Sequence, residues 1–125
     1  MALKPRVTDL QQRERRQRGY AASRTISERF PRVRELVFEL RFKGEAGKPL
    51  LSPYKQIYTG DMQAFFELQC PSRECAGGGF DLSPAADRAA GSHDGISHGL
   101  IKCRGVAQGS ACVVELQYEI VAFTT

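Results

Sequence analysis

Residues 34–42 read Arg34-Glu35-Leu36-Val37-Phe38-Glu39-Leu40-Arg41-Phe42, a stretch in which every second side chain is apolar. Successive side chains of a strand point to opposite faces, so one face here would carry Leu36, Phe38, Leu40 and Phe42. Glu35, Glu39 and Arg41 would lie on the other face. The stretch therefore predicts a half-buried strand and a mainly β fold.

Further apolar stretches predict the rest of an antiparallel sheet of about five strands, at residues 55–59, 62–70, 96–104 and 111–123. The last stretch has apolar residues on both faces. On one face lie Val114, Leu116, Tyr118 and Ile120, and on the other Val113 and Val121. This arrangement predicts a central strand that is covered on both faces.

One short helix is expected over residues 84–90, because Ser83 before Pro84 is typical of a helix start and Gly91 of a helix end. The predicted fold class is thus mainly β, or α+β with one short helix. Its core is expected to contain Leu36, Phe38, Leu40, Phe66, Leu68, Leu116 and Ile120.

The positive charge of the chain is concentrated in residues 1–30, which carry eight Lys or Arg against three acidic residues, while the whole chain has a net charge of +4. Thr8 with Gln11 is a capping-box pattern and Gly19 a helix stop, but the residues between them form almost no apolar face. We therefore expect a flexible or partly helical N-terminal arm over 1–30 and a single β-rich domain over 31–125.

The basic arm has two interpretations. It is either a solvated tail or a surface that binds nucleic acid or an acidic protein. In the second case the electrostatic attraction would not depend on the sequence of the partner. In the second case the contacts to phosphates are expected from Arg13, Arg15, Arg16 and Arg18.

Four cysteines carry most of the recognisable chemistry, as the pairs Cys70-x4-Cys75 and Cys103-x8-Cys112, each across a predicted turn. Two facing turns can supply the four soft ligands of a tetrahedral zinc ion, so we expect one zinc per chain bound by all four. From Cys70 onward the pairs resemble the two knuckles of a zinc-ribbon-type site, which implies a structural metal in a nucleic-acid or protein-binding protein.

Other interpretations of the cysteines stay open. The spacings differ from the usual two-residue gaps, and two disulfides, four inert buried thiols or an iron–sulfur cluster would also use four cysteines. His93 and His98 lie between the pairs and are alternative ligands, although loop histidines are commonly just solvated. With them the chain would be a thiol redox protein or a metal-dependent enzyme.

Several classes of protein are not expected. No stretch approaches the ~20 consecutive apolar residues of a membrane span, and the N-terminus shows no apolar run followed by a small-residue cleavage site. No Ser-His-Asp order or nucleophile elbow is present. The sequence thus predicts a small intracellular, cytoplasmic zinc-binding protein that acts as a binding or adaptor module rather than as an enzyme.

Overall fold

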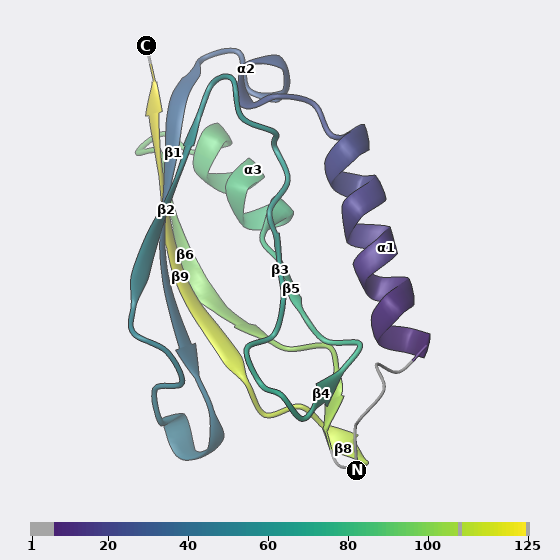
Figure 1. The fold of residues 1–125 in the computed structure, drawn as a ribbon. Helices are drawn as coiled ribbons and strands as arrows, with labels where there is room; N and C mark the ends of the chain where they lie inside the picture. The colour runs from purple at the N-terminus through teal and green to yellow at the C-terminus, as the bar shows by residue number, and fades with distance from the viewer. Residues whose placement is uncertain (1–6, 108, 125) are drawn as a thin grey trace.

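The computed structural model describes residues 7–107 and 109–124 and contains a central antiparallel sheet of four strands. These are β1 (Val33–Lys43), β2 (Tyr54–Thr59), β6 (Ile96–Lys102) and β9 (Glu115–Thr124), in the order β2-β1-β9-β6. The predicted mainly β, antiparallel architecture is confirmed (Figure 1).

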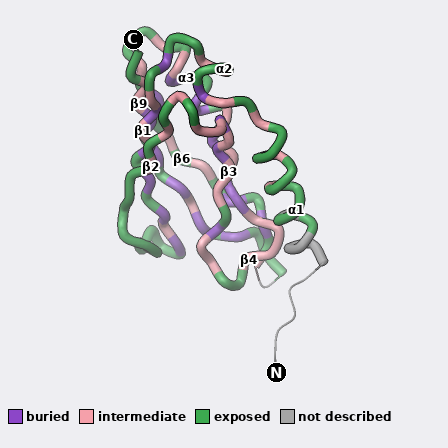
Figure 2. The backbone as a smooth tube through the Cα atoms, turned by 45° about the horizontal axis from the view of Figure 1, so that its top comes forward, coloured by how far each residue is buried: buried purple, intermediate pink, exposed green. Residues whose placement is uncertain are grey.

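One face of the sheet forms the core, as the alternation in residues 34–42 predicts. The two longest strands pair so that Phe38 lies opposite Ile120 and Leu40 opposite Tyr118, and all four side chains are buried. Against this face packs α3 (Ser83–Gly91), the helix predicted for 84–90, through the buried residues Ala85, Ala86 and Ala89. Their small side chains let the helix lie close to the sheet. Figure 2 shows buried residues along these strands.

Aromatic side chains from the segment between β2 and α3 complete the core. The ring of Phe66 lies 5.3 Å from that of Phe38 and 5.1 Å from that of Tyr58. Phe80 contacts Phe42, with ring centroids 5.6 Å apart. The segment that carries Phe66 and Phe80 includes the two-residue strands β3 (Glu67–Leu68) and β5 (Phe80–Asp81), which pair with each other.

The predicted strand over 62–70 is wrong for most of its length, since only β3 is strand there. The alternation of apolar and polar side chains in this stretch nevertheless reports burial, since Ala64 and Phe66 are both buried. The backbone beside them pairs with residues 24 and 26 of the N-terminal arm. The N–H of Ile26 donates to the carbonyl of Met62 at 2.8 Å, and the N–H of Ala64 donates to the carbonyl of Arg24 at 2.7 Å. These bonds take the place of a ladder with the central sheet, which therefore has four strands instead of five.

The predicted last strand is central, but its coverage on both faces is wrong. Leu116, Tyr118 and Ile120 are buried, whereas Gln117 and Glu119 on the opposite face are exposed, because α3 and the aromatic segment pack on one side only. The strand also starts later than expected. Residues upstream form β8 (Ser110–Ala111), which pairs with β7 (Val106–Ala107) in a small sheet with β4 (Cys75–Ala76).

Besides α3, which is the short helix expected from the sequence, two α-helices lie in the N-terminal arm that was expected to be flexible or partly helical. The basic arm contains α1 (Val7–Ala22), which continues past the predicted stop at Gly19. A short helix, α2 (Ile26–Arg29), follows it, and a 3-10 turn, η1 (Glu45–Gly47), follows β1. Thr25 and Glu28 form a capping box at the start of α2, and this spacing is a helix signal already present in the sequence.

The short helix α2 packs against the body of the molecule. Ile26 has no exposed surface, and the guanidinium of Arg29 forms an ion pair with Asp87 of α3 at 2.9 Å. The division of the chain at residue 30 stays a prediction, but these contacts place residues 26–30 with the core. Experiments on the arm are therefore better made by substitution than by deletion of residues 1–30.

Candidate metal centre

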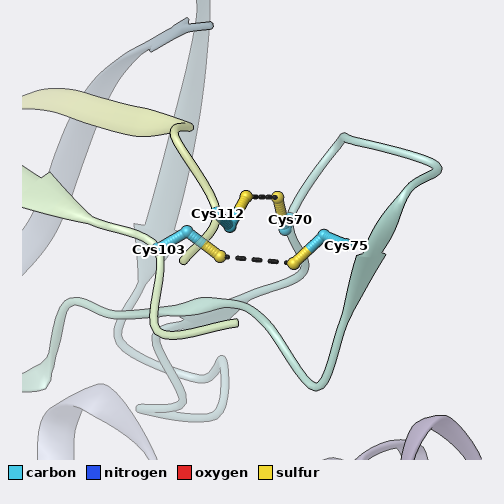
Figure 3. A group of neighbouring side chains, drawn as sticks. All are labelled: Cys70, Cys75, Cys103 and Cys112. Atoms are coloured by element: carbon cyan, nitrogen blue, oxygen red, sulfur yellow. Dashed lines mark hydrogen bonds between the residues drawn. The ribbon is translucent and has the colours of Figure 1, made fainter. Parts of the chain in front are cut away.

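The four cysteines meet in one cluster (Figure 3). The strands β4 and β8, which lie at the cluster, are found beyond one end of the central sheet (Figure 1). Cys70 follows β3, Cys75 lies in β4, Cys103 follows β6 and Cys112 follows β8. Antiparallel pairing of β4 with β7, and of β7 with β8, brings the segment after Cys70 against the hairpin between Cys103 and Cys112. Residues separated by more than thirty positions thus converge on one point.

The sulfur atoms have the spacing of ligands around a single ion. All four lie within 4.8 Å of one another, with 3.8 Å between Cys70 Sγ and Cys112 Sγ and 3.5 Å between Cys75 Sγ and Cys103 Sγ. A tetrahedron with metal–sulfur bonds near 2.3 Å has sulfur–sulfur edges of about 3.8 Å. A disulfide bond is far shorter, about 2.05 Å, and all four cysteines are free.

Backbone hydrogen bonds hold the two turns that carry the ligands. The N–H of Cys75 donates to the carbonyl of Ser72 at 3.3 Å, and that of Cys112 to the carbonyl of Gly105 at 2.9 Å. The N–H of Gly105 also donates to the sulfur of Cys103 at 3.4 Å. An amide that points at the sulfur favours the thiolate over the thiol.

Burial controls the protonation of the cluster. It raises the pKa of Cys70 to about 12 and raises that of Cys75 well above its ordinary value, because a thiolate loses its hydration there. Burial is also the largest single effect on Cys103 and acts against its thiolate. Hydrogen bonds from the backbone of Gly105 and Gly79 and from the thiols of Cys75 and Cys70 together outweigh it, so the pKa of Cys103 is lowered. A cation that binds here must displace protons, so binding is coupled to proton release.

Two glycines, Gly78 and Gly105, form the wall around the sulfurs. A Cβ at Gly78 would collide with the sulfurs of Cys75 and Cys103, and a Cβ at Gly105 would collide with the sulfur of Cys75. Both backbones therefore approach the cluster more closely than any other residue allows. The signal in the sequence was the run Gly77-Gly78-Gly79 after Cys75, and Gly105 two residues after Cys103.

No known protein family, curated protein or solved structure matches this chain. What the cluster does is therefore inferred from its own chemistry. Four clustered cysteine sulfurs can bind a metal ion, and within the described part of the chain the group of ligand atoms consists of these four. The same part of the chain holds no helix that is long and apolar enough to cross a membrane.

The structure does not bring the two histidines to the cluster. His93 is exposed in the turn after α3, and His98 is exposed on β6, where it lies opposite Glu119 on the outer face of the sheet. Of the predicted arginines, Arg13, Arg15 and Arg18 are exposed on α1, and Arg16 is half-buried.

We expect the variant Gly78→Ala to weaken metal binding. Its methyl group would have to displace two ligand sulfurs, and overpacking of this kind costs about 1–3 kcal/mol, which corresponds to roughly 5- to 150-fold in affinity. Competition with a chromophoric chelator measures the effect.

The matched control for this variant is Gly91→Ala at the end of α3, where an added Cβ meets no atom within 4 Å. It should leave the affinity for the metal unchanged. Equal affinities of Gly78→Ala and wild type would contradict the close packing of Gly78 on the sulfurs.

Proposed function

We propose that the four cysteines bind one zinc ion per chain and that this ion is structural. The observation that carries the proposal is the set of four free, clustered sulfurs whose measured pairs lie 3.5 and 3.8 Å apart. A tetrahedral site made of sulfur alone suits zinc or iron chemistry. The compact group favours a single ion, since an iron–sulfur cluster needs room for several atoms between its ligands.

Four thiolates saturate a tetrahedral zinc ion, which leaves no position for a water molecule or a substrate. This closed shell supports a structural ion over the alternative of a thiol redox protein or a metal-dependent enzyme. The exposed positions of His93 and His98 support the same choice.

Zinc would supply stability where the fold has little of its own. The strands β4, β7 and β8 have two residues each, and they contribute few hydrogen bonds to the turns around Cys70, Cys75, Cys103 and Cys112. An ion bound to ligands on both sides ties these turns to the ends of β6 and β9. The free energy of metal binding then becomes free energy of folding.

The zinc-stabilised domain is proposed to act as an intracellular binding module that contacts the phosphates of nucleic acid through α1. Arg13, Arg15, Arg16 and Arg18 lie within two turns of this helix. Among the described side chains, the ion pairs join Arg29 to Asp87 and Lys55 to Glu39, and none of them involves these four arginines. Unpaired arginines attract phosphates without reading sequence.

The test is binding of generic duplex DNA and single-stranded RNA over a series of salt concentrations. We expect wild type to bind, and the variant Arg13→Ala/Arg15→Ala/Arg16→Ala/Arg18→Ala to show a salt slope shallower by roughly 0.7–0.9 for each lost phosphate contact. Fluorescence anisotropy of labelled oligonucleotides measures both quantities.

The charge-matched control removes four exposed basic side chains of the body, as Arg32→Ala/Arg34→Ala/Arg41→Ala/Lys48→Ala. It should bind with nearly the wild-type slope. Absence of binding by wild type, or equal losses in both variants, would overturn the nucleic-acid contact and favour an acidic protein surface as the partner.

A further inference from the structure

A cavity of about 280 Å³ lies between α1 and the loop that packs on the cysteine cluster. Its charged lining comes from three separate parts of the chain. Arg15 and Arg16 belong to α1, Arg104 follows the metal-ligand candidate Cys103, and Glu67 belongs to β3. The remaining wall includes the backbone of residues 77–79.

The lining has an excess of positive charge. The lining includes three arginines and one glutamate, and none of these arginines forms an ion pair with any side chain in the described part of the chain. Arginine presents a planar array of donors that matches phosphate oxygens in bidentate geometry. Two such groups from α1 and one from the segment after Cys103 can approach one tetrahedral anion from different directions.

The glycine loop makes room for this anion and connects it to the metal centre. Residues 77–79 present no side chains, so a ligand can approach their backbone closely. On its other side the loop packs on the sulfurs, because Gly78 abuts Cys75 and Cys103. Arg104 lies between Cys103 and Gly105, so the metal centre and the cavity share one wall.

We infer that this cavity is a binding site for a backbone phosphate of nucleic acid, and that the metal centre holds its wall in place. The inference rests on the proposed function and makes it more specific. The phosphate contact of the basic arm is concentrated on Arg15, Arg16 and Arg104, while Arg13 and Arg18 lie outside the cavity.

Two variants that each lose two positive charges test the site. We expect Arg16→Ala/Arg104→Ala to bind a twelve-nucleotide single strand about 10-fold or more weakly than wild type, because it loses two of the three arginines around one phosphate. The control Arg13→Ala/Arg18→Ala should lose less than about 3-fold. Equal losses would overturn the cavity as the site and leave the broader contact through α1 intact.

Inorganic phosphate distinguishes the failure of the site from the failure of the proposed function. If wild type binds no oligonucleotide, the proposed function fails and the nucleic-acid assignment falls with it. NMR shifts of the amides of residues 77–79 that saturate with phosphate, and disappear in Arg16→Ala/Arg104→Ala, would then establish a site for free phosphate. No saturable shift would overturn the anion site altogether.

The shared wall predicts thermodynamic coupling between the two sites. In competition with a chelator, a saturating oligonucleotide should raise the apparent affinity of the protein for zinc by about 5-fold or more. The reason is that equilibrium coupling between two sites is reciprocal. Arg13→Ala/Arg18→Ala should keep this increase and Arg16→Ala/Arg104→Ala should lose it. If Arg16→Ala/Arg104→Ala loses zinc faster but binds oligonucleotide like wild type, the arginines serve the metal centre, and the proposal is wrong.

Discussion

The variant Cys75→Ser/Cys103→Ser is expected to lose its zinc and to unfold much more readily than wild type. These two sulfurs lie 3.5 Å apart and belong to opposite turns, so their replacement removes a ligand from each side of the cluster. Serine hydroxyls are poor zinc ligands at neutral pH. With free zinc at a thousand times its dissociation constant, the free energy of unfolding should fall by about 4 kcal/mol.

Urea unfolding in zinc and in excess chelator separates loss of the ion from loss of the side chains. In zinc, the free energy of unfolding of wild type should exceed that of the variant by about 4 kcal/mol. In chelator, wild type should fall to the stability of the variant, whose own stability should not change. Equal stability of the two proteins in zinc, with no effect of chelator on wild type, would contradict a structural ion.

The variant Phe66→Ala is expected to lower the free energy of unfolding by about 3–5 kcal/mol, because it leaves a large cavity in the core. Phe66 is 1% exposed and contacts the rings of Phe38 and Tyr58. It comes from a segment that adds little to the central sheet, so its contribution is packing rather than strand pairing. Urea unfolding of the zinc-loaded protein measures the change.

The control for the core is Phe123→Ala near the end of β9, which removes the same side chain at a position that is 41% exposed. Its effect should stay within about 0.5 kcal/mol. If the two variants were equally destabilised, the packing of Phe66 between Phe38 and Tyr58 would not be what holds the aromatic segment in place.

The fold was predictable where one physical requirement dominated the local sequence. Residues 34–42 must bury one face, and their alternation predicted β1 and its core side chains. The segment 62–70 also alternates, but alternation reports burial and not the partner of the backbone. The backbone of that segment bonds to Arg24 and Ile26, about forty residues earlier in the chain, and a local sequence pattern does not predict so distant a partner.

The sequence predicted the four cysteine ligands of the candidate site, but not the residues that surround them. Cysteines in two pairs across turns indicated a shared ion, and the structure places their sulfurs together. The roles of Gly78 and Gly105 depend on how closely two backbones approach the sulfurs after folding. The grouping of Arg16 with Arg104 likewise depends on how α1 lies against the loop of residues 77–79.

Elemental analysis of the full chain, purified without added metal, decides whether the four cysteines bind one zinc ion. We expect one equivalent of zinc per chain, together with native thiols that react with a thiol reagent only after the zinc is removed. Protein that is folded, free of zinc and reactive at all four cysteines would contradict this expectation. Iron and inorganic sulfide in place of zinc would contradict it as well.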